Sequence, residues 1–202
     1  MRALVILAHP GQESFNHAIA KHVVDRLQAD GHDAHFHDLY WEKFDPILGT
    51  EDLAREGQLP AEVVSHCEEL IAADALVFVH PNWWGQPPAI MKGWVDRVFR
   101  AGMAYRFVDR GDGVGIPEGM LKADRTLILN TANSTPSSEW GIIDPLDLWW
   151  RSTVLGMCGV KHVERRLFAP VVTSTVEQRE AWLAEAERIA SDVVGAVELG
   201  VG

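Results

Sequence analysis

Two adjacent tryptophans lie in a proline-rich stretch whose residue types suit the binding of a flat aromatic molecule. Trp83 and Trp84 stand within Pro81–Gly85, directly after the apolar run Ala75–Val79 and just before a helical pattern. Open α/β sheets bind their ligands at loops that follow the carboxyl ends of strands. Paired aromatic side chains in such a loop usually serve a site, so this stretch predicts a stacking surface for a heterocycle.

A second loop, after the first apolar run of the chain, suits a phosphate group. It contains His9, Ser14, Phe15 and Asn16 and precedes a helical pattern. Hydroxyl and amide side chains beside the free N–H groups of a helix start can hold phosphate without a positive side chain. A simple helix cap by Ser14 or Asn16 is the alternative, and the residues alone leave both open. The loop lacks the glycine patterns of Rossmann and P-loop sites.

A third loop, Asn130–Ser138, follows another apolar run. Thr131, Ala132 and Asn133 offer backbone N–H groups and one amide side chain there. Preorganised donors of this kind stabilise negative charge that develops on a bound ring. An ordinary polar connection is the alternative for this loop.

The three loops together resemble the flavin-dependent NAD(P)H:quinone oxidoreductase family, which has a flavodoxin-like fold. The resemblance is carried by Pro81–Gly85 with the helix Ala-Ile-Met-Lys-Gly-Trp-Val-Asp-Arg-Val-Phe, and by the pattern His-x-x-x-x-Ser-Phe-Asn that starts at His9. It implies a bound flavin that takes hydride from NAD(P)H and reduces a quinone or similar flat acceptor in two-electron steps. The residues that it assigns to the flavin are His9, Ser14, Phe15, Asn16, Pro81, Asn82, Trp83, Trp84, Gly85, Thr131, Ala132 and Asn133.

The chain departs from this family after the third loop. In the family the loop is glycine-rich, and a Tyr and a His that follow it assist hydride transfer. Here Ala132 and Asn133 replace the glycines, and neither Tyr nor His occurs between Asn130 and Lys161. Trp140 stands near the family's His position, so Asn133 and Trp140 are the expected catalytic residues. The departure keeps a second hypothesis open, namely a non-catalytic flavodoxin-like protein that regulates a partner or carries electrons.

The resemblance also implies an assembly and a choice of cofactor. The family includes FMN and FAD proteins, and the long segment Tyr40–Pro60 slightly favours FAD. Its members are dimers whose pockets are built partly by the partner chain. Eight tryptophans, Trp149 and Trp150 among them, provide aromatic surface for such a homodimer.

The elements that must position these loops follow from the pattern of apolar runs. Runs of strand length alternate with helical patterns, which predicts a doubly wound parallel sheet with helices on both faces. We expect one domain over residues 1–202 with five strands in the flavodoxin-like order 2-1-3-4-5. Segment 40–60 is expected to be irregular, and the glycine-rich segment 102–122 is expected to form a surface excursion. Gly93 indicates a close backbone approach to its helix. The expected strands span residues 3–8, 33–39, 75–79, 125–130 and 161–168.

Composition excludes several classes of partner. A net charge of −11 over 202 residues disfavours nucleic acid and anionic membrane surfaces. No apolar run approaches the roughly 20 residues of a membrane span, and two cysteines without a CxxC motif are typical of a reducing compartment, so we expect a cytoplasmic protein. One basic segment, Lys92–Arg110, is either a landing zone for a dinucleotide phosphate or a solvated face.

Three histidines resemble a metal-binding cluster. On a strand, however, His32 points away from His35 and His37, and no carboxylate spacing completes a ligand set. We therefore expect no metal site.

Overall fold

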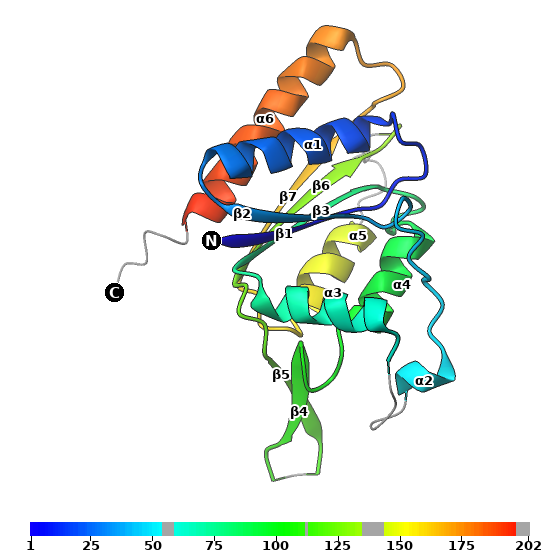
Figure 1. Cartoon of the computed structure of the whole chain (residues 1–202), viewed down its shortest axis with the longest axis vertical. Coiled ribbons are helices and arrows are strands. Elements are labelled where there is room, and N and C mark those ends of the chain that lie inside the picture. Colours follow the sequence, from blue (N-terminus) through cyan, green and yellow to red (C-terminus); the bar gives the residue numbers. More distant parts are fainter. Residues whose placement is uncertain (54–58, 112, 135–143, 197–202) are drawn as a thin grey trace.

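A five-stranded parallel sheet forms the centre of the computed structural model, which describes residues 1–53, 59–111, 113–134 and 144–196 (Figure 1). Its strand order is β2-β1-β3-β6-β7. Counted within this sheet alone, the order is the predicted 2-1-3-4-5, and the numbering differs because two further strands intervene in the chain. The sheet strands are β1 (Arg2–Leu7), β2 (Asp33–Asp38), β3 (Ala75–Pro81), β6 (Arg125–Thr131) and β7 (His162–Phe168).

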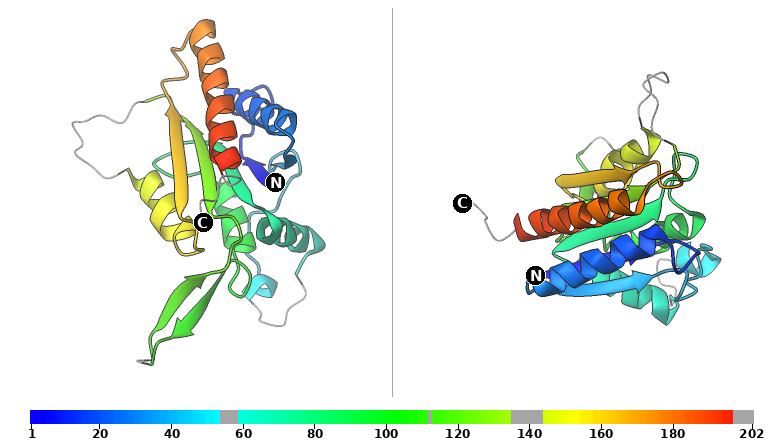
Figure 2. Two further views of the ribbon diagram at one scale, coloured as in Figure 1. Left: turned by 90° about the vertical axis from the view of Figure 1, so that its left-hand side faces the viewer. Right: turned by 90° about the horizontal axis from the view of Figure 1, so that it is seen from above.

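Helices cover both faces of the sheet, as predicted (Figures 1 and 2). Helices α1 (Phe15–Ala29) and α6 (Val176–Gly195) pack on one face. On the other lie α3 (Ala61–Ala72), α4 (Ala89–Val98) and α5 (Pro145–Leu148), which continues as the π-helix η2 (Trp149–Leu155). Strand β3 is buried along its whole length, because strands covered on both faces need apolar side chains on both.

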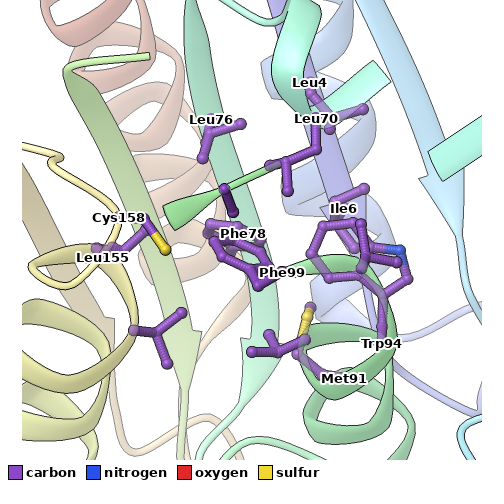
Figure 3. Packing of buried hydrophobic residues seen from close by; sticks show 14 of the residues in the cluster. Leu4, Ile6, Leu70, Leu76, Phe78, Met91, Trp94, Phe99, Leu155 and Cys158 are labelled. Carbon is purple, nitrogen blue, oxygen red and sulfur yellow. The ribbon is translucent and has the colours of Figure 1, made fainter. Parts of the chain in front are cut away.

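The core on the α3–α4–α5 side is rich in aromatic side chains (Figure 3). Phe78 of β3 stacks on Trp150 of η2 with ring centroids 4.4 Å apart, and Trp94 of α4 is fully buried. The close approach predicted at Gly93 is confirmed: a Cβ there would lie 2.2 Å from the backbone oxygen of Pro46.

Segment 40–60, expected to be irregular, contains a short helix, so that expectation is wrong in part, whereas the surface excursion expected at 102–122 is present (Figure 1). Segment 40–60 includes the short helix α2 (Thr50–Leu53). Segment 102–122 folds into an antiparallel hairpin of β4 (Tyr105–Asp109) and β5 (Gly115–Gly119), which projects from the body of the molecule (Figure 1). Glycines and Pro117 dilute the strand pattern of β5, and most of its residues are exposed, so no apolar alternation marks it.

The basic segment is largely paired within the chain. Arg97 is buried and its Nε lies 3.1 Å from Oδ2 of Asp52, while Lys92 pairs with Asp96 one helical turn away. Arg106 pairs with Glu118 across the hairpin. These ion pairs weaken the hypothesis that the segment receives a dinucleotide phosphate. Among the described helices, none is long and apolar enough to cross a membrane.

Candidate functional site

The three predicted loops meet at one edge of the sheet and line a single cavity of about 810 Å³. This volume falls within the range of small-molecule sites. The strands explain the convergence, because the carboxyl ends of β1, β3 and β6 lie side by side in a parallel sheet. Of the predicted residues, Gly85 is not among those that line the cavity, and Trp140 lies outside the described residues. Those that line it are His9, Ser14, Phe15, Asn16, Pro81, Asn82, Trp83, Trp84, Thr131, Ala132 and Asn133.

Trp84 and Gly85 are the central residues of a tight turn. The N–H of Trp83 donates to the oxygen of Gln86, and the N–H of Gln86 donates back, both at 3.0 Å. The φ angles of Trp84 and Gly85 are 57° and 70°, as in a type I′ turn, where glycine is favoured. A tryptophan with positive φ is rare and strained, and here the turn leaves its side chain fully exposed beside the cavity.

The loop before α1 lines the cavity beside the tryptophan loop, with the ring centroids of His9 and Trp83 6.3 Å apart. Ser14 caps the helix, since its Oγ accepts the N–H of His17 at 3.3 Å. Nδ1 of His9 lies 3.0 Å from the backbone nitrogen of Gly11 and 3.2 Å from its oxygen, so it accepts the N–H of Gly11 in one ring tautomer and donates to the oxygen in the other. Burial lowers the pKa of His9, a hydrogen bond from its ring N–H to the Gly11 oxygen partly offsets this, and the charge of His17 lowers the pKa further. The net shift favours neutral His9.

Hydrogen bonds tie the third loop to its neighbours. The amide of Asn16 and the hydroxyl of Thr131 bond to each other, with Nδ2 and Oγ1 2.9 Å apart, and both residues are buried. The N–H of Ala132 donates to the oxygen of Phe168, so it continues the sheet and does not point into the cavity. Oδ1 of Asn133 accepts the N–H of Val172 at 3.1 Å. Asn16 and Asn133 thus fix the shape of the cavity that they line.

The sequence analysis missed several residues at this site. Val171, from the loop after β7, and Ser134 also line the cavity. Behind Ser14, His17 bonds to Asp38 at the end of β2, with Nε2 and Oδ2 2.8 Å apart. The signal for Asp38 was its position at the carboxyl end of the strand next to β1, the same argument that predicted the three loops.

Beneath the tryptophan loop, His80 belongs to a buried polar network. Its Nδ1 donates to the oxygen of Pro81 at 2.8 Å, and its Nε2 accepts the indole N–H of Trp150 at 3.0 Å. Asn130 donates to the oxygen of His80, and Arg165 donates to Asn130. Burial is the main cause that lowers the pKa of His80 to about 4. The hydrogen bond to the Pro81 oxygen raises the pKa in part, and the charge of Arg165 lowers it further. His80 is therefore neutral and holds the strand end that leads into the cavity loop.

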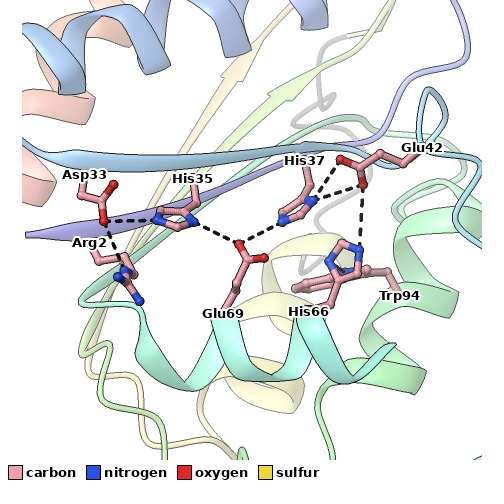
Figure 4. A network of polar contacts seen from close by, with 8 residues as sticks. All are labelled: Arg2, Asp33, His35, His37, Glu42, His66, Glu69 and Trp94. Carbon is pink, nitrogen blue, oxygen red and sulfur yellow. Dashed lines mark hydrogen bonds and ion pairs between the residues drawn. The ribbon is translucent and has the colours of Figure 1, made fainter. Parts of the chain in front are cut away.

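The fold also supplies carboxylates to the histidines of β2 (Figure 4). His37 lies between Oε1 of Glu42, 2.9 Å from Nδ1, and Oε2 of Glu69, 3.0 Å from Nε2. One ligand atom each from His37, Glu42 and His66 lies within 4.8 Å of the others, close enough for a metal ion. However, Nδ1 of His66 accepts the indole N–H of Trp94, so Nε2 carries the proton that a metal would have to displace. The ring nitrogens of His37 and His66 are therefore engaged in hydrogen bonds with carboxylates and an indole. That the protein binds no metal here stays a prediction.

Comparison with known proteins connects this geometry to a family. Residues 1–193 match the Flavodoxin_2 family, described as a flavodoxin-like fold. The Uncharacterized NAD(P)H oxidoreductase of Haemophilus influenzae is 32% identical over 186 residues, which cover 91% of each chain. The chain belongs to the flavodoxin-like NAD(P)H:quinone oxidoreductase family. The chain is also similar to the NAD(P)H dehydrogenase [quinone] 1 of Rattus norvegicus, with 29% identity over 216 residues. The alignment covers 93% of this chain and 77% of the rat protein.

A solved structure of the family has the same architecture. The NAD(P)H:quinone oxidoreductase from Methanothermobacter marburgensis superimposes with a TM-score of 0.78 at 27% identity, covering 95% of this chain and 96% of its own. Together with the named relatives, this places the chain among the NAD(P)H-dependent oxidoreductases and confirms the predicted enzyme class.

Proposed function

We propose that the protein binds a flavin in this cavity and passes hydride from NAD(P)H, through the flavin, to a quinone or similar flat acceptor. The observation that carries the proposal is the convergence of the three loops on one cavity at the carboxyl edge of the sheet. Its lining combines the aromatic side chains of Trp83, Trp84 and Phe15 with hydrogen-bonding groups from the loop before α1. A flavin is likewise a flat ring with a phosphate at the end of a polar chain.

The chemistry of the lining residues fits this group. The Ser14 hydroxyl and the N-terminal N–H groups of α1 are donors suited to a phosphate, and His9 would join them in the tautomer that carries its proton on Nε2. Oδ1 of Asn82 is buried without a partner in the described structure. Buried amide oxygens are normally hydrogen-bonded, and the isoalloxazine ring carries an N–H that can meet such an acceptor.

The residues then have separable tasks. A bound flavin supplies the redox chemistry, taking hydride at N5 and giving two electrons to the acceptor. Trp83 and Trp84 would shape the stacking surface, and the Trp84 side chain would shield the ring from water. The N–H groups of Asn133 and Ser134 follow the N–H that Ala132 uses in the sheet, and they would face the ring where negative charge develops. Asn133 thus remains the proposed catalytic residue, together with Trp140.

The proposed cofactor is FAD in preference to FMN, on the sequence argument alone. The segment thought to favour FAD packs against α4, where Pro46 meets Gly93 and Asp52 meets Arg97. No lining residue of the cavity comes from its described part, residues 40–53 and 59–60. The mass of the chromophore released from purified protein decides between the two flavins.

The proposed assembly is a homodimer that covers the exposed aromatic edge of the site. Trp84 is fully exposed, and Leu148 on α5 is 49% exposed. The two lie on neighbouring segments, because Gly85 closely approaches Pro145 at the start of α5. Exposed apolar side chains gathered in this way mark interaction surfaces. Sedimentation velocity of wild type and Trp84→Ala tests the assembly, and a monomeric wild type would refute it.

The test of the proposed function is flavin binding followed by turnover. Purified protein should be yellow or should take up flavin when titrated, and it should oxidise NADH or NADPH with a soluble quinone faster than about 1 s⁻¹. A protein that binds flavin but turns over more slowly would be an electron carrier, the second hypothesis. A colourless protein that takes up no flavin would contradict the proposal.

A matched pair of tryptophan variants locates the site. Trp83→Ala should weaken flavin binding about tenfold, because an aromatic stacking partner contributes about that much. Trp41 is exposed too but does not line the cavity, so Trp41→Ala should bind flavin like wild type. Equal effects of both variants would argue against binding in this cavity.

A further inference from the structure

His17 is linked by hydrogen bonds to both a fixed carboxylate and the hydroxyl that faces the cavity. Its Nε2 lies 2.8 Å from Oδ2 of Asp38, and its Nδ1 lies 2.8 Å from Oγ of Ser14. Asp38 is held in place because its Oδ1 accepts the backbone N–H groups of Tyr40 and Trp41, both at 3.1 Å. The His17 and Asp38 side chains are only 18% and 11% exposed. The geometry is therefore a chain that runs from Asp38 through His17 to Ser14.

The proton on His17 sets the direction of the last hydrogen bond in this chain. Asp38 is an acceptor, so Nε2 of His17 carries a proton in either charge state. When His17 is neutral, Nδ1 must accept the proton of the Ser14 hydroxyl, which then points away from the cavity. When His17 is protonated, Nδ1–H donates to Oγ, and the hydroxyl proton of Ser14 is free to turn into the cavity.

A positive charge on His17 would add to the hydroxyl and backbone donors that can hold a phosphate at this end of the cavity. Among the described residues that line the cavity none is a lysine or arginine, and burial lowers the pKa of His9, which also lies there. The charged and titratable groups that face His17 are Asp38 from β2 and His9 from the loop before α1, whose ring centroid is 6.2 Å away. The next titratable side chains on α1, Lys21 and His22, bond to Asp25 and Glu187.

We propose that binding of the flavin phosphate is coupled to uptake of one proton from solvent by Nδ1 of His17. Asp38 stays ionised in this step, and His17 becomes a cation behind the phosphate. The Ser14 hydroxyl, which donates to Nδ1 while His17 is neutral, is then free to donate to the phosphate. His17 and Asp38 are positioning residues that act through Ser14. This inference rests on the proposed function, since it concerns the phosphate end of the same cavity.

The first test compares three flavins on wild-type protein. FMN and FAD should bind more tightly as the pH falls from 8.5 to 6.5, and riboflavin, which lacks phosphate, should bind equally at both pH values. Calorimetric titration of the phosphorylated flavin at pH 7.5, in two buffers of different ionisation enthalpy, should show proton uptake. A pH-independent affinity without proton uptake overturns the inference but leaves the proposed function standing. Failure of all three flavins to bind overturns the proposed function itself.

The second test removes the titrating group and keeps its size. His17→Gln should weaken binding of the phosphorylated flavin about tenfold at pH 6.5, the weight of a charge-assisted hydrogen bond, and should abolish proton uptake. Its riboflavin affinity should match wild type. The phosphate's own titration is common to both proteins and cancels in the comparison.

His22→Gln is the matched control on the same helix, because His22 pairs with Glu187 on α6, away from the cavity. It should keep wild-type affinity and proton uptake. A His17→Gln protein that loses riboflavin and FMN binding equally would show a structural role and overturn the inference. The wild-type pH profile and calorimetry remain decisive if a variant fails to fold.

Discussion

Two histidines near the same edge of the sheet differ in what their surroundings allow. His80, on the α5 side, is fully buried, and its Nε2 accepts the indole N–H of Trp150. A proton on Nε2 would remove that acceptor, so His80 is held neutral. His17, on the α1 side, lies between Asp38 and the hydroxyl of Ser14, which lines the cavity. The directions of their hydrogen bonds thus indicate a structural role for His80 and a ligand-dependent role for His17.

Replacement of the buried histidine should have the largest effect. His80→Leu leaves the indole N–H of Trp150 without an acceptor inside the core, which should lower the free energy of unfolding by about 3 kcal/mol. His17→Gln, at a partly exposed pair, should lower it by less than about 1 kcal/mol. Urea unfolding of both variants measures the difference. Similar losses would erase the distinction between the two histidines.

The decrease of the unfolding free energy at acidic pH should depend on buried His80. The folded-state pKa of His80 is about 4, below the 6.5 of an unfolded histidine, so the unfolded chain binds the proton first. The stabilisation is complete above about pH 6.5 and is lost as the pH falls toward 4, on the order of 2 kcal/mol by pH 5. Burial also lowers the pKa of His66 to about 4, and the charge of His37 adds to this, so His66 acts with the same sign. Urea unfolding at pH 7 and pH 5 should show a smaller loss of unfolding free energy in His80→Leu than in wild type. Equal losses in the two proteins would contradict a lowered pKa for His80.

The sequence predicts the sheet and the meeting of the loops because both depend on rules of topology. Apolar runs mark the strands of the sheet, and parallel strands place their carboxyl ends at one edge. The predicted strand boundaries agree with the structure to within one residue, as for β1, expected at Ala3–Ala8 and found at Arg2–Leu7, except at the end of β3. Local signals also mark helix starts: Asp144 precedes a proline and Thr175 stands three residues before Gln178, and their side chains accept the N–H groups of Leu146 and Gln178.

Contacts between distant segments could not be predicted from local patterns. Trp150 reaches His80 across 70 positions, and Asp38 reaches His17 across 21. Neither pair has a spacing that marks it in one sequence. Glu69 is likewise one of many helical glutamates until the fold places it beside His37. Topology indicates where a site lies, whereas the direction of its hydrogen bonds needs the coordinates.

Asp38→Asn should test the role of His17 through a moderate change in flavin affinity. The amide oxygen can still accept from Tyr40 and Trp41, but its NH₂ group would face Nε2 of His17 and donate to it. His17 would then carry its proton on Nδ1 even when neutral, and Ser14 would be a phosphate donor at any pH. We expect affinity for FMN or FAD to fall about fivefold at pH 6.5 and to change less than about twofold at pH 8.5. Equal loss at both pH values would show that Asp38 acts only by fixing the Tyr40–Trp41 turn.

The smallest effect should come from His37, a charged histidine remote from the cavity. Burial alone would lower its pKa, but the hydrogen bonds and charges of Glu42 and Glu69 outweigh burial and raise the pKa above 6.5. The folded state therefore binds this proton more tightly than the unfolded chain, so the stabilisation is present below pH 6.5 and is lost as the pH rises through the raised pKa. His37→Gln should reduce stability by less than about 1 kcal/mol at pH 6 and by less still at pH 9. Urea unfolding at the two pH values measures this, and flavin affinity should not change. A larger loss at pH 9 than at pH 6 would mean that His37 stabilises the fold as a neutral group, like His80.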